Sequence, residues 1–259
     1  MPNTAETDAL HSVTASLGVP RRLAPFLPNL FRGFTSLGSR PQRLVTAFAR
    51  AGIGPRSRVL DLACGKGALA VALAARTGCR VVGVDAYAPF LEQARTLSRR
   101  RATARRCAFI VGDVRSPPLA PDALFDGAIM VGLLGAGRAA SLLRRWTRPG
   151  GVYLLDDAVR VPGVRAAAFR EVPTLEESRR VIERRGDTIV REIALAQSST
   201  AGHQRRTRRA LVANAHRVAR AHPHLSALLE EFLDQQHAAE HALARSLCPM
   251  AWVVRRGAN

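Results

Sequence analysis

Three features are scarce in this 259-residue sequence, and each scarcity argues against a class of protein. Aromatic residues make up 5% of the chain, which is few for a module that binds nucleic acid by stacking bases. The four cysteines form no CxxC pair and have no histidines at zinc-finger spacing, so we expect free thiols in a reducing cytoplasm and no metal site. No apolar run approaches the length that spans a bilayer, and residues 1–8 lack the order of a secretory signal.

Lysine is also nearly absent, because Lys66 is the only one in the chain. Lysine and arginine together nevertheless outnumber the acidic residues by 39 to 20, and a net charge of +19 favours a polyanionic partner. Arginine in place of lysine is typical of GC-rich coding, which explains the type of base but not the excess. The simplest interpretation of the two densest clusters is a solvated helix end and a solvated helix face. The clusters are Arg99–Arg101 with Arg105 and Arg106, and Arg205, Arg206, Arg208 and Arg209.

From about residue 41 the hydrophobic pattern alternates between the periods of helix and strand. Leu44, Val45 and Phe48 give a first helix one apolar face, with Ser39 as its expected N-cap. Buried strands that alternate with helices predict a parallel sheet with helices on both faces, which binds ligands at the carboxyl ends of its strands. The strands are expected at 58–62, 80–84, 107–111, 126–131 and 152–155, and the helices between them at 68–77, 89–100 and 139–147.

Beyond residue 157 the pattern predicts a helix over 174–185, a sixth strand over 187–194 and a last strand over 250–254. We expect the last strand to pair antiparallel beside the sixth at the sheet edge. Two long helices, about 204–221 and 225–246, lie between these strands and exceed what a hairpin connection needs. The predicted organisation is therefore an irregular N-terminal lid segment, 1–40, and a core, 41–259, with a helical insertion at about 200–247.

The turn after the first strand carries the clearest chemistry. A turn that leaves a strand and opens a helix lets the backbone approach a ligand, and Gly65 and Gly67 allow this without a side-chain clash. Asp85 follows Asp61 by 24 residues and ends the second strand, where a carboxylate can accept hydrogen bonds from both hydroxyls of a ribose. Asp113 closes the third strand, where a short acid can accept from an adenine amino group.

These motifs occur in the order Asp61-x-x-Cys64-Gly65-x-Gly67, Asp85, Gly112-Asp113, Phe125-Asp126 and Pro149-Gly150-Gly151. The order resembles the class I S-adenosylmethionine-dependent methyltransferase family, in its small-molecule type, over about residues 40 to 157. The resemblance implies a doubly wound, mostly parallel, seven-stranded Rossmann-like sheet with an antiparallel last strand. It also implies that S-adenosyl-L-methionine is bound with its methionine part at the first turn, its ribose at Asp85 and its adenine at Asp113 and Val114. The implied cofactor contacts are Asp61, Ala63, Cys64, Gly65, Gly67, Asp85, Ala86, Asp113, Val114 and Met130.

The sequence departs from the family pattern at one position, and it lacks the motifs of two alternative classes. Ala63 stands where the family usually has its first glycine. A nicotinamide enzyme would carry G-x-G-x-x-G at the first turn, and here the turn continues into Ala68 instead. No Asn-Pro-Pro-Tyr-like motif follows the fourth strand, which argues against amino-methylating DNA and glutamine enzymes and leaves carbon, oxygen, sulfur and small-amine acceptors. Cys64 has no His or Asp beside it in sequence and is interpreted as a packing residue rather than a nucleophile.

Three functions remain open from the sequence. The first is methyl transfer to a small molecule, with the insertion and the N-terminal segment closing over it. The second is methylation of RNA held by the arginine clusters, and the third is a cofactor-binding protein without catalysis. A hydroxyl or amine acceptor would need a nearby base. The candidates for that base are Asp156, Asp157, His203 and His237, and the sequence assigns none of them.

Overall fold

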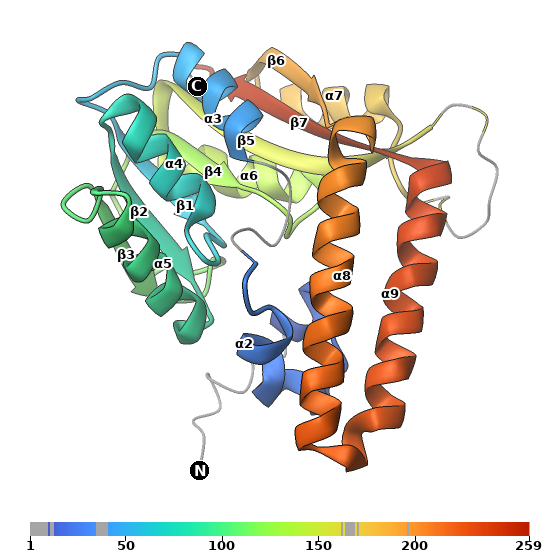
Figure 1. Ribbon diagram of the computed structural model, residues 1–259. Coiled ribbons are helices and arrows are strands. Elements are labelled where there is room, and N and C mark those ends of the chain that lie inside the picture. Colours follow the sequence, from blue (N-terminus) through green and yellow to red (C-terminus); the bar gives the residue numbers. More distant parts are fainter. Residues whose placement is uncertain are drawn as a thin grey trace.

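The computed structural model places a helix-covered sheet beside a long helical hairpin, with the N-terminal segment packed against the hairpin (Figure 1). It describes residues 10, 13–34, 41–161, 163, 169, 171–195 and 197–258, and the side chains of all of these except 197–205 and 241–245. The expected N-cap Ser39 lies outside the described residues.

Within the described residues, seven strands form one sheet in the order β3-β2-β1-β4-β5-β7-β6. β7 pairs antiparallel with both β5 and β6, and the other neighbours pair parallel, which confirms the predicted doubly wound sheet. β7 lies between β5 and β6, so β6 is the edge strand. Burial explains this order, because β7 is almost wholly buried whereas β6 exposes most of its positions. The strands are β1 (Arg58–Leu62), β2 (Arg80–Asp85), β3 (Cys107–Val111), β4 (Phe125–Met130), β5 (Thr147–Arg160), β6 (Thr188–Ala194) and β7 (Leu247–Arg255).

Helices cover both faces of this sheet. α3 (Pro41–Arg50), α4 (Ala68–Thr77) and α5 (Ala88–Arg100) contribute to one buried cluster, which includes Leu44 and Leu73. On the other face, α6 (Ala136–Trp146) and α7 (Leu175–Glu183) contribute to a second cluster around Trp252. Two separate apolar clusters, one on each side of a sheet, are what the alternating strand and helix periods predict.

β5 is much longer than the predicted strand at 152–155. It begins at Thr147 and passes through Pro149-Gly150-Gly151, where its register with β4 shifts. Gly150 has a φ of 72°, and its N–H donates to the carbonyl of Arg256 over 3.0 Å. The expected turn is therefore an irregularity within β5. Its hydrogen bond to Arg256, the residue directly after β7, holds it in place.

A third apolar cluster joins the N-terminal segment to the hairpin. The hairpin consists of α8 (Gln197–Ala221), the short helix η3 (Pro223–Leu225) and α9 (Ser226–Ser246). The N-terminal segment contributes η1 (Arg21–Phe26) and α2 (Leu27–Leu30), and its Leu23, Leu27 and Leu30 are fully buried beside Phe232 of α9. The hairpin leaves the sheet after β6, at the carboxyl edge of the parallel strands. None of the described helices is long and apolar enough to cross a membrane.

Candidate active site

The turn between β1 and α4 has the left-handed backbone that its sequence predicts. Ala63, Gly65 and Gly67 have φ values of 58°, 52° and 73°. The alanine thus adopts the conformation that a glycine favours, at a steric cost of roughly 1–2 kcal/mol. At Gly67 the glycine is also needed for packing, because a Cβ there would lie 2.7 Å from the Cβ of Ala94 on α5.

The carboxylate of Asp85, at the end of β2, binds the backbone that follows both β1 and β2. Its Oδ2 accepts from the backbone N–H of Gly65 over 2.8 Å, and its Oδ1 accepts from the N–H of Tyr87 over 2.9 Å. Burial raises the pKa of the Asp85 carboxyl, and these two N–H groups partly offset the shift. Each carboxylate oxygen keeps a further lone pair, so the residue can also accept from the two hydroxyls of a ribose. The position and donor set of Asp85 fit the role that the resemblance implies.

Asp61 lies in β1 beneath the turn and is almost fully buried, with 2% of its surface exposed. Burial, and then the negative charge of Asp85, raise the pKa of its carboxyl to about 8, while a backbone hydrogen bond from Ala70 opposes the shift. Among the described residues its Oδ2 has no hydrogen-bond partner. The unpartnered Oδ2 of Asp61, together with the unfilled lone pairs of Asp85, leaves hydrogen-bonding capacity at the turn for a polar ligand.

Cys64 and Ala86 flank the turn without polar roles. The Sγ of Cys64 lies against Gly83 of β2, where an added Cβ would approach it to 2.8 Å. Burial raises the pKa of this thiol well above its usual range, so it stays protonated and packs as an apolar group. Ala86, directly after Asp85, is half-buried.

The carboxylate of Asp113, the predicted adenine contact, already binds a side chain of the protein. Asp113 follows β3 and accepts a two-pronged ion pair from Arg115, whose Nε and Nη2 lie 2.9 Å from Oδ1 and 2.6 Å from Oδ2. Arg115 lowers the pKa of this carboxyl. Val114 is buried in the cluster that also contains Met130 of β4. The carboxylate of Asp113 is therefore present at the expected strand end, but a ligand there would share it with Arg115.

The two acidic base candidates lie in β5 and hold the backbone that follows β4. Asp156 Oδ1 accepts from the N–H of Gly132 over 2.7 Å, and burial raises the pKa of its carboxyl to about 6. Asp157 Oδ2 accepts from the N–H of Ala136 over 2.7 Å and so caps the start of α6. Asp156 is ionised near neutral pH, whereas Asp157 has a clear structural task.

The two histidine candidates belong to the hairpin helices. His237 lies half-buried on α9 of the hairpin, and the side chain of His203 on α8 lies outside the description. Among the described residues no cluster of three or more His, Cys, Asp or Glu side chains has the arrangement of a metal site.

Lys66, within the turn, is a site residue that the sequence reasoning missed. Its Nζ donates to the carbonyl of Phe31 over 2.5 Å and to that of Phe34 over 3.2 Å, and it lies 5.5 Å from the ring centre of Phe90. Its exposed fraction is 4%, and burial lowers its pKa to about 8. A lone lysine in a chain that otherwise uses arginine was the available signal.

Comparison with known proteins agrees with this geometry. Residues 59–151 match the family model described as a methyltransferase domain. Over 91% of this chain and 98% of the other, the fold superposes on a SAM-dependent methyltransferase from Geobacter sulfurreducens in complex with S-adenosyl-L-homocysteine, with a TM-score of 0.76 and 22% identity. The chain therefore has the class I methyltransferase fold, and its residues 59–151 match a methyltransferase domain.

A curated protein and a further solved structure that resemble this chain are named for different reactions. The 24-methylenesterol C-methyltransferase 2 of Oryza sativa subsp. japonica is 34% identical over 104 residues, which are 39% of this chain and 28% of the rice protein. The chain thus spans about a quarter of the length of that curated relative. The cyclase SpnF superposes over 97% of both chains with a TM-score of 0.70 and 19% identity. The methyltransferase fold alone therefore does not determine the reaction.

Proposed function

We propose that this methyltransferase-fold protein binds S-adenosyl-L-methionine and transfers its methyl group to a small-molecule acceptor. The observation that carries the proposal is Asp85, a buried carboxylate held by Gly65 and Tyr87 at the ends of β1 and β2, with acceptor capacity left for a ribose. The match of residues 59–151 to methyltransferase domains supports the same cofactor.

The roles of the other residues follow from their positions. The turn from Ala63 to Gly67 would hold the methionine part, and Asp113, Val114, Ala86 and Met130 would line the remainder of the cofactor. When bound, the cofactor supplies an electrophilic methyl group on a sulfonium. The protein then has to orient the acceptor in line and exclude water. Asp156, with a pKa of about 6, is the candidate base for an acceptor that loses a proton.

The acceptor region that we propose lies between the carboxyl edge of the sheet, the N-terminal segment and the hairpin. The buried cluster of Leu23, Leu27 and Phe232 holds the last two together as one unit next to the cofactor turn. The rice relative is named as a methyltransferase of a sterol, which supports a small organic acceptor.

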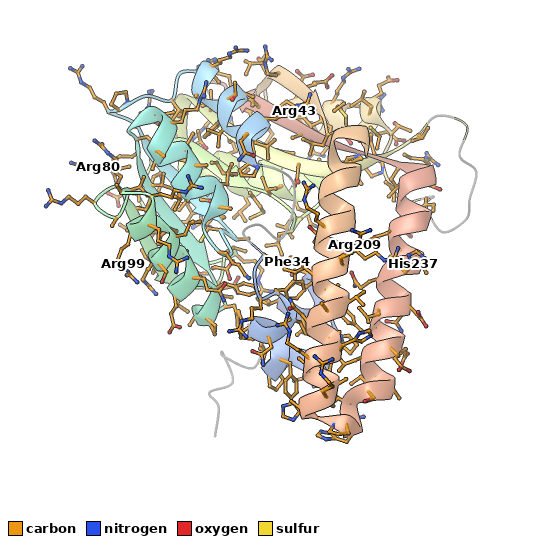
Figure 2. All side chains as sticks on the ribbon, viewed as in Figure 1. Phe34, Arg43, Arg80, Arg99, Arg209 and His237 are labelled. Atoms are coloured by element: carbon orange, nitrogen blue, oxygen red, sulfur yellow. The ribbon has the colours of Figure 1, made fainter. Side chains whose placement is uncertain are left out.

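Methylation of RNA is the alternative that the arginine clusters keep open. The first cluster lies at the end of α5, which runs from the carboxyl edge of the sheet back to the amino edge. There the carbonyl of Arg106 accepts from the N–H of Val81 at the start of β2. The second cluster lies on α8, beyond the carboxyl edge. Figure 2 shows Arg99 on the outer side of the core and Arg209 on the hairpin. This separation supports the small-molecule acceptor over a continuous RNA groove.

Methyl transfer from tritiated S-adenosylmethionine tests the proposal. Incubation with a small-metabolite extract should label a low-molecular-weight product, while total RNA incubated in parallel stays unlabelled. Asp85→Ala should abolish the labelling, and Asp122→Ala, an exposed acid in the loop before β4, should retain it. Label in RNA that ribonuclease releases would replace the first function with the second, and no label in either pool would favour a binding protein.

A further inference from the structure

A hollow of about 260 Å³ lies between α6 and α7, apart from the cofactor turn. It is smaller than the sites that hold drug-sized ligands, which measure roughly 300–1,000 Å³. Four of its ten lining residues are arginines and only one is an acid. The lining residues used below are Ser141 and Arg144 of α6, and Arg184, Arg185 and Asp187, which follow α7.

The single acid in the hollow is already committed. Asp187 Oδ1 accepts from Arg144 Nε over 3.0 Å and from the N–H of Gly257 over 2.9 Å, and its Oδ2 accepts from the hydroxyl of Tyr153 over 2.7 Å. Its side chain is 1% exposed. Among the described residues, Asp187 thus forms its ion pair with Arg144.

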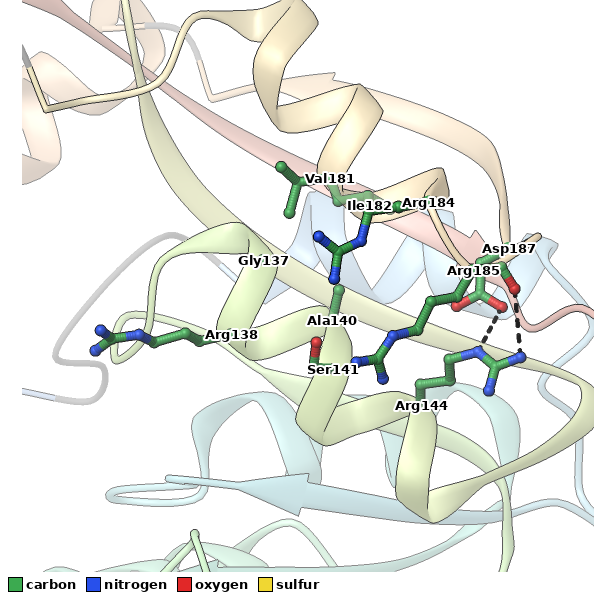
Figure 3. A pocket seen from close by; sticks show the side chains of 10 residues that line it. All are labelled: Gly137, Arg138, Ala140, Ser141, Arg144, Val181, Ile182, Arg184, Arg185 and Asp187. Carbon is green, nitrogen blue, oxygen red and sulfur yellow. Dashed lines mark hydrogen bonds and ion pairs between the residues drawn. The ribbon is translucent and has the colours of Figure 1, made fainter.

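Two guanidinium groups remain without an acidic partner. In the described part of the chain, Arg184 and Arg185 lie within 4 Å of no carboxylate oxygen. Figure 3 shows the guanidinium group of Arg184 near Ala140 and that of Arg185 near the hydroxyl of Ser141. Two forked donors and a hydroxyl around one small hollow match the oxygens of a phosphate group, which arginine binds in a two-pronged manner.

We propose that this hollow binds a small phosphorylated ligand through Arg184 and Arg185. The geometry is independent of the cofactor site, so the ligand would be a second species that binds on the outer face of α6 and α7. The limited volume favours a free phosphate ester or diphosphate over a polymer.

Calorimetry with inorganic pyrophosphate at constant ionic strength tests the anion site. The wild-type protein should bind it in the millimolar range or tighter, and Arg184→Gln/Arg185→Gln should weaken binding at least tenfold. Arg99→Gln/Arg100→Gln, which removes the same charge from the exposed end of α5, should bind like the wild type. Equal binding by both double variants, or no binding to the wild type, would overturn the proposal.

A competition experiment identifies the source of the phosphate. Glycerol phosphate should displace pyrophosphate, and a single-stranded oligonucleotide with blocked ends should not. Displacement by the oligonucleotide alone would contradict the small-ligand assignment. Binding of S-adenosylhomocysteine should be the same in all variants, so this test stands apart from the proposed function.

Lys66 supports a second proposal, which depends on the proposed function. Its two bonds hold the carbonyls of Phe31 and Phe34, where the chain leaves α2. Asn214 of α8, 3% exposed, donates to the carbonyls of Leu30 and Arg32 over 2.8 and 2.9 Å. Residues 30–34 are thus held by one side chain from the cofactor turn and another from the hairpin.

We infer that Lys66 is a positioning residue that couples the cofactor turn to closure of the N-terminal segment. Residues 30–34 make their polar contacts through backbone carbonyls, so movement of the turn on cofactor binding passes directly to this segment. Phe34, labelled in Figure 2, marks the place where the segment lies between the core and α8.

Limited digestion with trypsin tests the coupling, because Arg32 is exposed at the end of α2. S-adenosylhomocysteine should slow cleavage after Arg32 at least fivefold in the wild type and in Lys66→Arg, but not in Lys66→Met. Each variant is digested at a concentration of S-adenosylhomocysteine that calorimetry shows to saturate it. Protection that persists in Lys66→Met would overturn the coupling, and loss of binding in that variant would make Lys66 a ligand instead. No binding to the wild type would instead refute the proposed function.

Discussion

Ala63 is the residue at which the turn departs from the methyltransferase motif that it resembles, and it adopts a left-handed backbone. Its φ of 58° lies in the region that glycine adopts freely, and Ala102, after α5, has a similar φ of 54°. Steric strain at such a position costs roughly 1–2 kcal/mol, while glycine adds about 0.4–1 kcal/mol of entropy loss on folding.

Ala63→Gly should therefore raise the free energy of unfolding by about 0.5–1 kcal/mol, measured by urea denaturation. Ala102→Gly, a matched change outside the site, should give a gain of similar size. A loss of stability in Ala63→Gly alongside a gain in Ala102→Gly would mean that the Ala63 methyl group stabilises the turn by packing.

Asp61 makes stability depend on pH in an unusual direction. Its pKa is raised from 3.8 to about 8 on folding, so the folded state holds a proton that the unfolded state releases between these values. The contribution of Asp61 to stability is therefore lost as the pH rises through that window.

Asp61→Asn mimics the protonated carboxyl and should remove this dependence. At pH 8 to 9 the variant should be more stable than the wild type by roughly 4–6 kcal/mol, because the wild type must then fold with a carboxyl that it has to protonate or bury charged, and near pH 4 the two should agree. Thermal unfolding followed across this range provides the measurement. Parallel curves with no convergence at low pH would show that Asp61 is ionised in the folded protein.

At the scale of elements, the hairpin and the N-terminal segment share a core of their own. Phe232 of α9 is fully buried in that cluster, whereas Phe48 of α3, equally buried, belongs to the cluster under the sheet. Substitutions at these two phenylalanines therefore test the hairpin and the cofactor-binding core separately.

Phe232→Ala should cost roughly 3–5 kcal/mol of local stability and reduce methyl transfer strongly, yet leave the affinity for S-adenosylhomocysteine within about threefold. Phe48→Ala, with the same loss of volume, should weaken both. Titration calorimetry and the labelling assay measure the two effects. Loss of cofactor affinity in Phe232→Ala would show that the hairpin is part of the cofactor site itself.

The sequence pattern predicted the alternating elements well because periods of two and 3.6 residues are local properties. It could not give the position of β7, since the insertion of that strand between β5 and β6 depends on burial against distant chain. Likewise, Pro149-Gly150-Gly151 looked like a turn, and only pairing with the last strand turns it into an irregularity within β5.

At the scale of the whole molecule, some site residues could be predicted from local sequence patterns, whereas contacts between distant residues could not. Asp61, Asp85 and Asp113 lie toward one edge of the sheet because parallel strands bring their carboxyl ends together, and their roles toward a cofactor stay a prediction. The bonds from Lys66 to Phe31 and Phe34 join residues more than thirty positions apart and have no periodic signal. The arrangement of charge was equally hidden, since a net charge of +19 does not say that two arginine clusters lie on separate parts of the surface.

The account rests on Asp85 as the ribose-binding carboxylate of an S-adenosylmethionine site, and calorimetry with S-adenosylhomocysteine tests this most directly. Loss of a charge-assisted hydrogen bond costs about 1.5–3 kcal/mol, so Asp85→Ala should weaken binding by more than tenfold. Asp122→Ala should bind as the wild type does, with both variants shown by circular dichroism to be folded. Unchanged affinity in folded Asp85→Ala would contradict the assignment of the site.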